Sequence, residues 1–436
     1  MARRLFGTDG VRGVAGEFLS ADLALKLGRA AAAISPAETP QVLIVRDTRE
    51  SGEMLEAAVA AGVAAAGGHA LLGGVLPTPG ASLLVRRYGL DLAAVVSASH
   101  NPYRDNGIKF FGPDGTKIDD SQEEGIEELL GTGSDRPIGR VRELHGAGGD
   151  YVRELELRFK DLDLSGRRVL LDCANGASYR VAPEIFRRLG AEVDTVAAEP
   201  DGRNINEGCG STHVEALAER VAEGGYHVGF AFDGDADRVL AVDRSGQVVD
   251  GDELMALAAL HLRGAGRLPG DGVAVTVMTN YGFHTAMGAA GIAVATTPVG
   301  DRHVLAELLR RGWALGGEQS GHIIDTGFVP AGDGTASALL TMEALSGRDL
   351  AERDAMERLP QRLINVEVAS MDGLEGAQGI WDAVERESNA LAGRGRVLVR
   401  PSGTEPLVRV MVEAPDADEC DAIANRLAKV VKSELP

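Results

Sequence analysis

Short apolar runs alternate along the chain with longer segments whose apolar residues recur at helical spacing. Runs such as 42–45, 169–171 and 273–277 have the length and the β-branched content of buried strands. Strands and helices that alternate in this way are typical of layered α/β domains. The alanine-rich stretch 57–66 follows a polar run and is too short to cross a membrane, so it predicts a buried helix.

The last part of the chain has a different order of elements. A strand from Leu363, a helix across Trp381 and two strands on either side of residues 401–406 are expected there, followed by a closing helix. Strands and helices grouped in this order predict a smaller α+β unit.

Junctions rich in glycine or containing proline separate the chain into blocks, and they lie near residues 145–149, 250–252 and 359–360. A chain of 436 residues is also too long for one hydrophobic core. We therefore predict four domains, which are residues 1–148, 149–250, 251–360 and 361–436.

Composition narrows the classes of partner. The net charge of −21 repels anions at long range, which argues against binding to nucleic acid or to an acidic membrane surface. No export signal and no membrane-spanning run is recognisable, and three widely spaced cysteines fit unpaired thiols in a reducing compartment. A cytoplasmic protein is expected. A homodimer is possible, but the sequence does not reveal the oligomeric state.

Three aspartates, Asp233, Asp235 and Asp237, stand at alternate positions with only glycine and alanine between them. They separate two apolar runs, 227–232 and 239–243, that both have the pattern of buried strands. Small neighbours allow the carboxylates to converge, and an all-oxygen ligand set suits Mg²⁺ better than zinc or copper. The pattern therefore predicts a magnesium site between two strands.

The plain alternative is a solvated acidic loop in an acidic chain. An EF-hand calcium loop also begins with alternating acids, but Arg238 and Arg244 stand where that loop needs glycine and glutamate. Because Mg²⁺ bound by few protein groups usually meets phosphate, phosphate chemistry is the leading hypothesis.

A second candidate loop follows the apolar run that ends near Val96 and contains Ser97, Ser99 and His100. A serine at a strand end can present its hydroxyl to a substrate, although serine, asparagine and proline are also ordinary turn residues. The Gly-x-Ser-x-Gly elbow of hydrolases is absent around these serines. Lys109 adds a cation just downstream in a chain where only six of the 44 basic residues are lysines.

A third loop places Glu318, Gln319 and Ser320 between glycines and before His322. Donors and acceptors grouped in this way suit sugar hydroxyls, and a plain connection between strands is the alternative.

A fourth segment combines a glycine-containing turn, hydroxyl groups and guanidinium groups, and consists of Arg400, Ser402, Gly403, Thr404 and Arg409. These are the parts of an anion-binding nest, so the segment predicts a phosphate clamp. A rigid surface turn held by two prolines is the alternative.

Together the four motifs resemble those of the α-D-phosphohexomutase superfamily and occur in its order. They are Ser97-Ala-Ser-His-Asn-Pro102, Asp233-Gly-Asp-Ala-Asp-Arg238, Gly317-Glu-Gln-Ser-Gly-His322 and Arg400-Pro-Ser-Gly-Thr404. Further segments resemble the members that act on glucosamine phosphates, namely residues 6–13, 171–176, 204–206 and 209–213. The resemblance covers nearly the whole chain.

The resemblance implies three α/β domains with mixed sheets and a smaller α+β domain around a central cleft. In this arrangement Ser99 is the phosphorylated nucleophile, and the three aspartates hold one Mg²⁺ per chain together with an oxygen of the serine phosphate. Glu318 and Ser320 hydrogen-bond the sugar hydroxyls, and the fourth segment grips the phosphate that is not reacting. The four domains then carry the phosphoserine loop, the metal, the sugar contacts and the phosphate clamp, in that order.

The implied reaction converts glucosamine 6-phosphate reversibly into glucosamine 1-phosphate through a bisphosphorylated sugar, and it would feed UDP-N-acetylglucosamine synthesis. Lys109 and His322 are the candidate general base and acid, His100 organises the serine loop, and Arg238 counters charge on the moving phosphoryl group. Because the average surface repels a sugar phosphate, a local group of cations is expected. Its members are Arg12, Lys109, Arg302, Arg400 and Arg409.

Gln319 separates this hypothesis from its nearest rival, a mutase for mannose or glucose phosphates, whose members commonly have methionine at that position. A sugar-phosphate-binding protein without activity and a metal-dependent phosphatase are alternatives of other classes. The sequence departs from the superfamily pattern at Ala236, where many relatives have glycine. A methyl group is expected to be tolerated there unless the backbone needs a positive φ.

Overall fold

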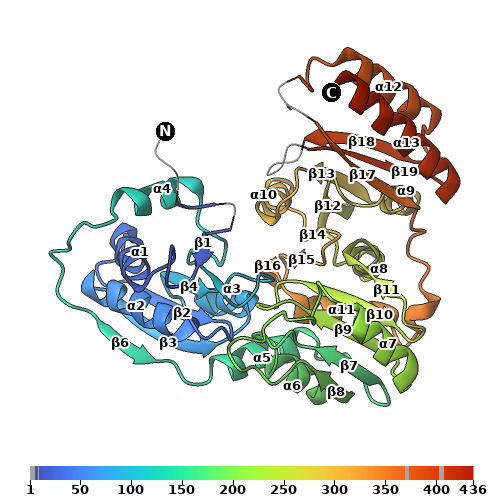
Figure 1. Cartoon of the computed structure of the whole chain (residues 1–436). Helices are drawn as coiled ribbons and strands as arrows, with labels where there is room; N and C mark the ends of the chain where they lie inside the picture. The colour runs from blue at the N-terminus through green and yellow to red at the C-terminus, as the bar shows by residue number, and fades with distance from the viewer. Residues whose placement is uncertain (1–4, 8, 369–372, 402–406, 436) are drawn as a thin grey trace. The chain divides into compact units, whose positions relative to one another are not determined.

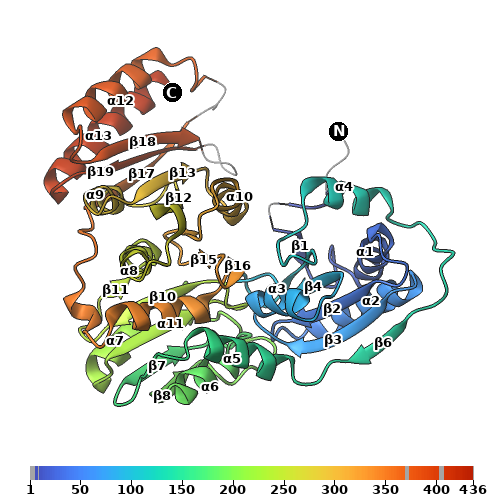
Figure 2. The same cartoon turned by 180° about the vertical axis from the view of Figure 1, so that it is seen from behind.

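The computed structural model describes residues 5–7, 9–368, 373–401 and 407–435. Three α/β domains are followed by a smaller α+β domain, as Figure 1 and the view from behind in Figure 2 show along the colour ramp. This confirms the predicted fold class. The strands expected at 42–45, 169–171 and 273–277 are confirmed as β2, β7 and β12, and the buried helix expected at 57–66 is confirmed within α2.

The first domain contains a mixed sheet in the order β1-β5-β4-β2-β3-β6. Its strands are β1 (Val11–Val14), β2 (Gln41–Arg46), β3 (His69–Val75), β4 (Leu92–Val96), β5 (Asp105–Phe111) and β6 (Arg140–Glu143). Its helices are α1 (Ala21–Ile34), α2 (Gly52–Ala65), α3 (Thr78–Arg87) and α4 (Asp120–Glu128). Strand β4 pairs in parallel with β2 and antiparallel with β5, so both loops that leave the carboxyl ends of β2 and β4 reach the same edge.

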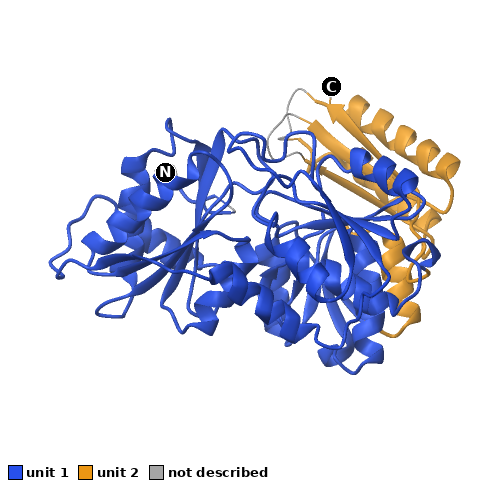
Figure 3. Cartoon of the chain, turned by 90° about the horizontal axis from the view of Figure 1, so that it is seen from below, with its two compact units in different colours: residues 1–278, 293–353 blue, residues 279–292, 354–436 orange. Residues whose placement is uncertain are grey.

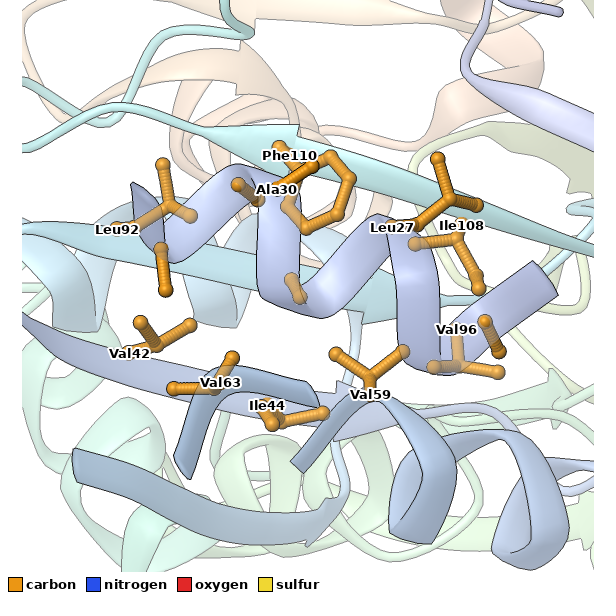
Figure 4. Packing of buried hydrophobic residues seen from close by; sticks show 14 of the residues in the cluster. Leu27, Ala30, Val42, Ile44, Val59, Val63, Leu92, Val96, Ile108 and Phe110 are labelled. Atoms are coloured by element: carbon orange, nitrogen blue, oxygen red, sulfur yellow. The ribbon is translucent and has the colours of Figure 1, made fainter. Parts of the chain in front are cut away.

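Helices α1 and α2 pack against each other over this sheet, and Figure 4 shows the buried side chains between them. Leu27 of α1 and Val59 of α2 are completely buried with Ile44 of β2. The two helices approach so closely that a Cβ on Gly62 would lie 2.0 Å from the carbonyl oxygen of Leu25. The small residues of the alanine-rich stretch are therefore required for this contact.

The second domain has a five-stranded sheet in the order β11-β10-β9-β7-β8. Its strands are β7 (Arg168–Asp172), β8 (Glu192–Val196), β9 (Val228–Phe232), β10 (Val239–Asp243) and β11 (Val248–Val249). Its helices are α5 (Ala147–Arg158), α6 (Val181–Arg188) and α7 (Glu215–Gly224). Strands β9 and β10 are antiparallel neighbours, so the aspartate loop that joins them is a tight connection at one edge of the sheet.

The third domain repeats the mixed five-stranded arrangement in the order β13-β12-β14-β15-β16. Its strands are β12 (Gly272–Thr276), β13 (Ala293–Thr297), β14 (Leu315–Gly317), β15 (Ile323–Asp325) and β16 (Val329–Gly332). The helices in this part of the chain are α8 (Gly251–Gly264), α9 (Tyr281–Ala289), α10 (Asp301–Arg311) and α11 (Gly334–Leu345), with short 3-10 turns at Pro269–Asp271 and Leu350–Glu352. The exact domain boundaries stay predictions, because α5 begins at Ala147 and packs on helices of both the first and the second domain.

The C-terminal domain is an antiparallel sheet in the order β17-β19-β18 with two helices. Its elements are β17 (Gln361–Glu367), α12 (Gln378–Ala390), β18 (Arg396–Pro401), β19 (Leu407–Glu413) and α13 (Ala417–Glu434). They follow the predicted order of strand, helix, two strands and closing helix. Val408 and Val410 of β19 are fully buried in a core that includes Leu427 of α13.

The chain forms two compact units, residues 1–278 with 293–353 and residues 279–292 with 354–436, which Figure 3 colours separately. Helix α9 belongs to the second unit because Glu413, fully buried in β19, accepts a hydrogen bond from the backbone nitrogen of Tyr281 at 2.9 Å. Within the residues that the structure describes, no helix is both long and apolar enough to span a membrane.

Candidate active site

Two loops from different domains meet in the first unit. Ser99 lies in the loop after β4, and Asp233 follows β9 directly. The hydroxyl of Ser99 donates a hydrogen bond to the Asp233 carboxylate, with 2.6 Å between Oγ and Oδ2, and both side chains are buried. The structure therefore brings together the candidate nucleophile and the candidate metal site, which are 134 residues apart in sequence.

A buried arginine that sequence reasoning missed holds the serine loop. Arg49 forms an ion pair with Asp47, at 2.9 Å between Nε and Oδ2, and neither side chain is exposed. The Arg49 guanidinium also donates to the backbone carbonyl oxygens of Ser99 and Asn101, each at 2.9 Å, and to that of Pro102. Removing one partner of such a buried pair typically costs about 3–5 kcal/mol. The polar run after β2 could have indicated this role. Because β2 and β4 are parallel neighbours, the loops that follow them meet at the same edge of the sheet.

The backbone of Ser99 is held in an uncommon conformation, with φ of 51°. Its nitrogen donates to Ser97 Oγ at 3.0 Å, and Ser97 in turn donates to Asp47 at 2.6 Å. From the second domain, the amide of Asn206 donates to the carbonyl oxygen of Ser99 at 2.9 Å. Left-handed backbone at a non-glycine residue persists where surrounding contacts over-determine it, and such residues cluster at active sites.

The three aspartates place carboxylate oxygens within 4.8 Å of one another. Among the described residues, one buried oxygen of Asp235 and one of Asp237 have no hydrogen-bond partner. Gly234 lets this loop approach the serine loop, since a Cβ there would lie 2.5 Å from the Ser99 carbonyl oxygen. Buried acceptors without donors are costly, so the donor set fits a hard cation, and the triplet could bind a metal.

The pKa values of the aspartates also indicate that this loop needs cations nearby. Burial and the neighbouring carboxylates of Asp237 and Asp235 raise the pKa of Asp233 well above its usual range. Burial alone would also raise the pKa of Asp237, but the positive charges of His322 and Lys109 outweigh it and lower that pKa well below its usual range. The loop thus concentrates more negative charge than a buried site tolerates without cations.

Lys109 of β5 supplies one of these cations. Its amino group lies 2.7 Å from Asp235 Oδ2, 3.7 Å from Asp9 Oδ2 and 3.9 Å from Asp237 Oδ2, and the side chain is almost completely buried. Burial alone would lower the pKa of Lys109, but the three carboxylates reverse the effect and raise it. Lys109 is therefore a fixed positive charge beside the reactive serine loop.

His100, Arg12 and Arg238 also lie around the serine. His100 Nδ1 is 3.3 Å from Ser99 Oγ, and burial together with the charges of Arg238 and Arg12 lowers the pKa of its imidazole. Arg12 donates hydrogen bonds to the side chain and the backbone oxygen of Asp9. Arg238 Nε lies 3.9 Å from the carboxylate of Asp237.

The loop of the third domain that is predicted to contact the sugar lies between β14 and β15. Glu318 accepts a hydrogen bond from the backbone nitrogen of Gly300 at 3.0 Å, and the Gln319 amide donates to Asp250 at 3.1 Å. Ser320 is exposed. His322 is buried, and its Nδ1 lies 3.6 Å from Asp237 Oδ2, which brings the third domain to the candidate metal site.

Arg302 forms ion pairs with two acidic residues of the first domain. Its guanidinium pairs with Asp120 and with Glu123, the latter at 2.8 Å between Nη2 and Oε1, both in α4 of the first domain. A role for Arg302 in substrate binding stays a prediction.

In the second unit, Arg400 of β18 and Arg409 of β19 are directly opposed across an antiparallel pair, so their side chains emerge on one face. Ser402, Gly403 and Thr404 lie outside the described residues.

The backbone conformation at Ala236 shows whether a methyl group is tolerated at this position. Ala236 has φ of 57°, the left-handed region in which glycine is favoured, and its methyl group is completely buried. The condition under which alanine is poorly tolerated is therefore met, and Ala236 stores backbone strain beside the candidate metal ligands.

We predict that Ala236→Gly stabilises the protein. Relief of about 1–2 kcal/mol of left-handed strain exceeds the roughly 0.5–1 kcal/mol that glycine loses in the unfolded chain, so the free energy of unfolding should rise modestly. Thermal and urea unfolding measure the change. Ser346→Gly, at φ of 49° after helix α11, is the matched control and should give a similar gain. A clear loss of stability in Ala236→Gly alone would show that its methyl group is needed for packing.

Comparison with known proteins gives a consistent result over the whole chain. Models of the four phosphoglucomutase/phosphomannomutase domains match in order: α/β/α domain I at residues 3–136, domain II at 149–246, domain III at 250–363 and the C-terminal domain at 363–430. The phosphoglucosamine mutase of Moorella thermoacetica is 52% identical, with 98% of this chain and 99% of that protein covered. The phosphoglucosamine mutase of Mycolicibacterium paratuberculosis is 48% identical, with 99% of each covered.

Solved structures share the fold. A phosphoglucomutase/phosphomannomutase family protein from Burkholderia thailandensis superposes with a TM-score of 0.84 at 24% identity, covering 99% of this chain and 97% of that one. N-acetylphosphoglucosamine mutase from Aspergillus fumigatus, solved in complex with GlcNAc-6P and magnesium, superposes with a TM-score of 0.64 at 19% identity, covering 99% and 96%. With four domain models in order and relatives near half identity over their full length, the chain belongs to the phosphoglucomutase/phosphomannomutase family and, within it, to the phosphoglucosamine mutases.

Proposed function

We propose that this enzyme interconverts glucosamine 6-phosphate and glucosamine 1-phosphate through a phosphoserine and a bisphosphorylated sugar. The observation that carries the proposal is the 2.6 Å contact between the Ser99 hydroxyl and Asp233, at a carboxylate triplet with unpartnered buried oxygens. The names of the full-length relatives supply the substrate. The substrate and the unpaired cysteines fit work in the cytoplasm.

In the proposed reaction, phosphorylated Ser99 transfers its phosphoryl group to O1 of glucosamine 6-phosphate. The bond from serine Oγ to phosphorus breaks as the bond from O1 forms, and the 1,6-bisphosphate then turns around so that its 6-phosphate returns to the serine. Such transfer depends mainly on alignment and charge neutralisation. The clamps from Arg49 and Asn206 on the Ser99 carbonyl oxygen support alignment because they fix the loop from two domains.

Proton movement accompanies each transfer, because the attacking sugar hydroxyl must lose its proton. His322 and Lys109 both lie within 4 Å of Asp237 beside the serine loop. The imidazole of His322 can accept the proton in its neutral form, whereas Lys109, which the carboxylates hold protonated, can only donate one. Lys109 and Arg238 also counter the charge on the moving group.

We propose that Asp233, Asp235 and Asp237 hold one Mg²⁺ per chain together with an oxygen of the serine phosphate. The all-oxygen ligand set and the unpartnered oxygens of Asp235 and Asp237 support this assignment. The bound ion would neutralise charge on the phosphoryl oxygens during transfer.

Arg400 and Arg409 support a phosphate clamp in the C-terminal domain. Their opposed positions bring two guanidinium groups to one face of the sheet, where both can bind the same anion. The phosphate of the sugar that is not reacting fits this role, since guanidinium groups bind phosphate through paired hydrogen bonds.

Rates with three substrates test the proposed function. The enzyme should prefer glucosamine 6-phosphate over glucose 6-phosphate and mannose 6-phosphate in kcat/KM, because a polar Gln319 suits an amino sugar. Gln319→Met should reduce that preference, roughly tenfold if a single hydrogen bond is lost. Preference of the unaltered enzyme for mannose phosphate would overturn the assignment, and net release of inorganic phosphate would indicate a phosphatase.

Ser99→Ala tests the nucleophile. The variant should lose turnover but still bind glucosamine 6-phosphate, because the hydroxyl is needed to carry the phosphoryl group rather than to hold the sugar. Intact mass with site mapping should find one phosphoryl group on Ser99 of the unaltered protein. Undiminished turnover in the variant would remove Ser99 as nucleophile, whereas an unaltered enzyme that only binds sugar phosphate would indicate a silent binding protein.

Metal removal tests the ion. Chelation should abolish turnover, and Mg²⁺ should restore it. Asp235→Asn should weaken Mg²⁺ binding measured by calorimetry, because an amide replaces a charged ligand of a hard cation. Asp243→Asn is the control, since Asp243 is a buried aspartate at the end of β10 that lies outside the triplet. Full activity after exhaustive chelation would exclude the proposed metal.

A further inference from the structure

Lys117 joins carboxylates of two different domains. Its amino group lies 2.5 Å from Asp9 Oδ1 in the first domain and 2.6 Å from Asp301 Oδ2 at the start of α10 in the third. The lysine side chain keeps only 17% of its surface exposed. Neither this lysine nor the two aspartates belong to the four sequence motifs.

Each of the two carboxylates reaches a different candidate proton-transfer group. Asp9 Oδ2 accepts a hydrogen bond from Arg12 and lies 3.7 Å from the amino group of Lys109. Asp301 Oδ2 lies 3.7 Å from Nε2 of His322. Lys117 is therefore one contact away from both groups.

The contacts close into a ring of alternating charge around the site. In order, the ring consists of Lys109, Asp9, Lys117, Asp301, His322 and Asp237, and the 3.9 Å between Lys109 and Asp237 closes it. Asp235 lies outside the ring and contacts Lys109 at 2.7 Å. All three α/β domains contribute members. In such a ring each cation fixes the position of two carboxylates, so a change at one member is felt at its neighbours.

Neighbouring opposite charges keep Lys117, Asp9 and Asp301 ionised although all three are largely buried. Burial would lower the pKa of Lys117, but Asp301 and Asp9 raise it. Burial would likewise raise the pKa of Asp9, but Lys109, Lys117 and Arg12 lower it. Without the central cation, two carboxylates would lose their shared partner and move toward other donors.

The bridge borders a cavity of about 530 Å³, which Lys117, Asp301 and His322 line. Its other walls include the apolar side chains of Ile118 and Leu305 and the polar side chain of Arg302. The Arg302 guanidinium pairs with acids of α4, whereas the amino group of Lys117 contacts both Asp9 and Asp301.

We infer that Lys117 is a positioning residue for phosphoryl transfer. Through Asp9 it fixes the positions of Lys109 and Arg12, and through Asp301 it fixes the position of His322. The inference rests on the proposed function. A lysine that only joined two domains would also bridge carboxylates, but its loss would not act selectively on the chemical step.

The chain contains a matched bridge that serves as control. Arg158 of the second domain pairs with Asp325 of the third at 3.1 Å and lies 3.7 Å from Glu343, with 16% of its side chain exposed. Like Lys117, it is a half-buried cation shared by two carboxylates across a domain boundary. Its partners Asp325 and Glu343 belong neither to the serine loop nor to the aspartate triplet.

The experiment compares Lys117→Met, Lys117→Arg, Asp301→Asn and Arg158→Gln with the unaltered enzyme, in steady-state assays with glucosamine 6-phosphate. Misplacing a reacting group by about 1 Å lowers the reaction rate roughly 100-fold. Lys117→Met should therefore lower kcat by about that factor, with little change in KM. Lys117→Arg should recover much of the loss, and Arg158→Gln should leave kcat and KM unchanged. Should Lys117→Met fail to fold, Asp301→Asn, which keeps the side-chain shape, must show the same selective loss of kcat.

Crystal structures of Lys117→Met and Arg158→Gln provide a readout besides activity. Displacement of Lys109 or His322 in the first variant only would support the inference. Unchanged kcat, an equal loss in Arg158→Gln, or a rise in KM without loss of kcat would overturn it. An unaltered enzyme that fails to interconvert the glucosamine phosphates would instead overturn the proposed function, which separates the two failures.

Discussion

The concentration of buried carboxylates beside Ser99 is the constraint on which the rest of the site depends. Asp233, Asp235 and Asp237 place carboxylate oxygens within 4.8 Å of one another, and all three side chains are buried. Buried negative charge of this density is stable only where cations surround it. Lys109 and His322 meet part of that demand from the first and third domains, and the unpartnered carboxylate oxygens fit a metal ion.

The need of these buried carboxylates for cations also explains how a protein with a negative net charge can bind a negatively charged substrate. A net charge of −21 repels sugar phosphates at long range, yet the immediate surroundings of Ser99 contain Arg12, Lys109 and Arg238. These cations lie beside aspartates of the protein itself, so they are in place before a substrate arrives. A phosphoryl group that enters can exchange with those carboxylates as partner of the same cations, at little cost in reorganisation.

Strain and rigidity accompany this arrangement. Ser99 and Ala236, on the two loops that meet, both have left-handed backbone, and Arg49 ties the serine loop through carbonyl oxygens. Positive φ at non-glycine residues costs free energy, which the buried ion pair of Arg49 and Asp47 helps to offset. The gain is a hydroxyl held in one position before any substrate arrives, which is what a reaction governed by alignment requires.

The sequence by itself determined the elements and the chemistry of the motifs. Strand patterns, the aspartate triplet and the predicted phosphate-binding segment are local features, because side-chain periodicity and ligand type depend on neighbouring residues. Only the tertiary structure decided that Arg49 and Asp47 hold the serine loop, that Arg302 pairs with α4, and that Lys117 and Asp301 bridge two domains. Those contacts join residues from 50 to more than 180 positions apart, and strand order, which no local pattern encodes, brings them together. The positive φ of Ala236 was equally hidden, since alanine carries no sign of the backbone conformation that its loop imposes.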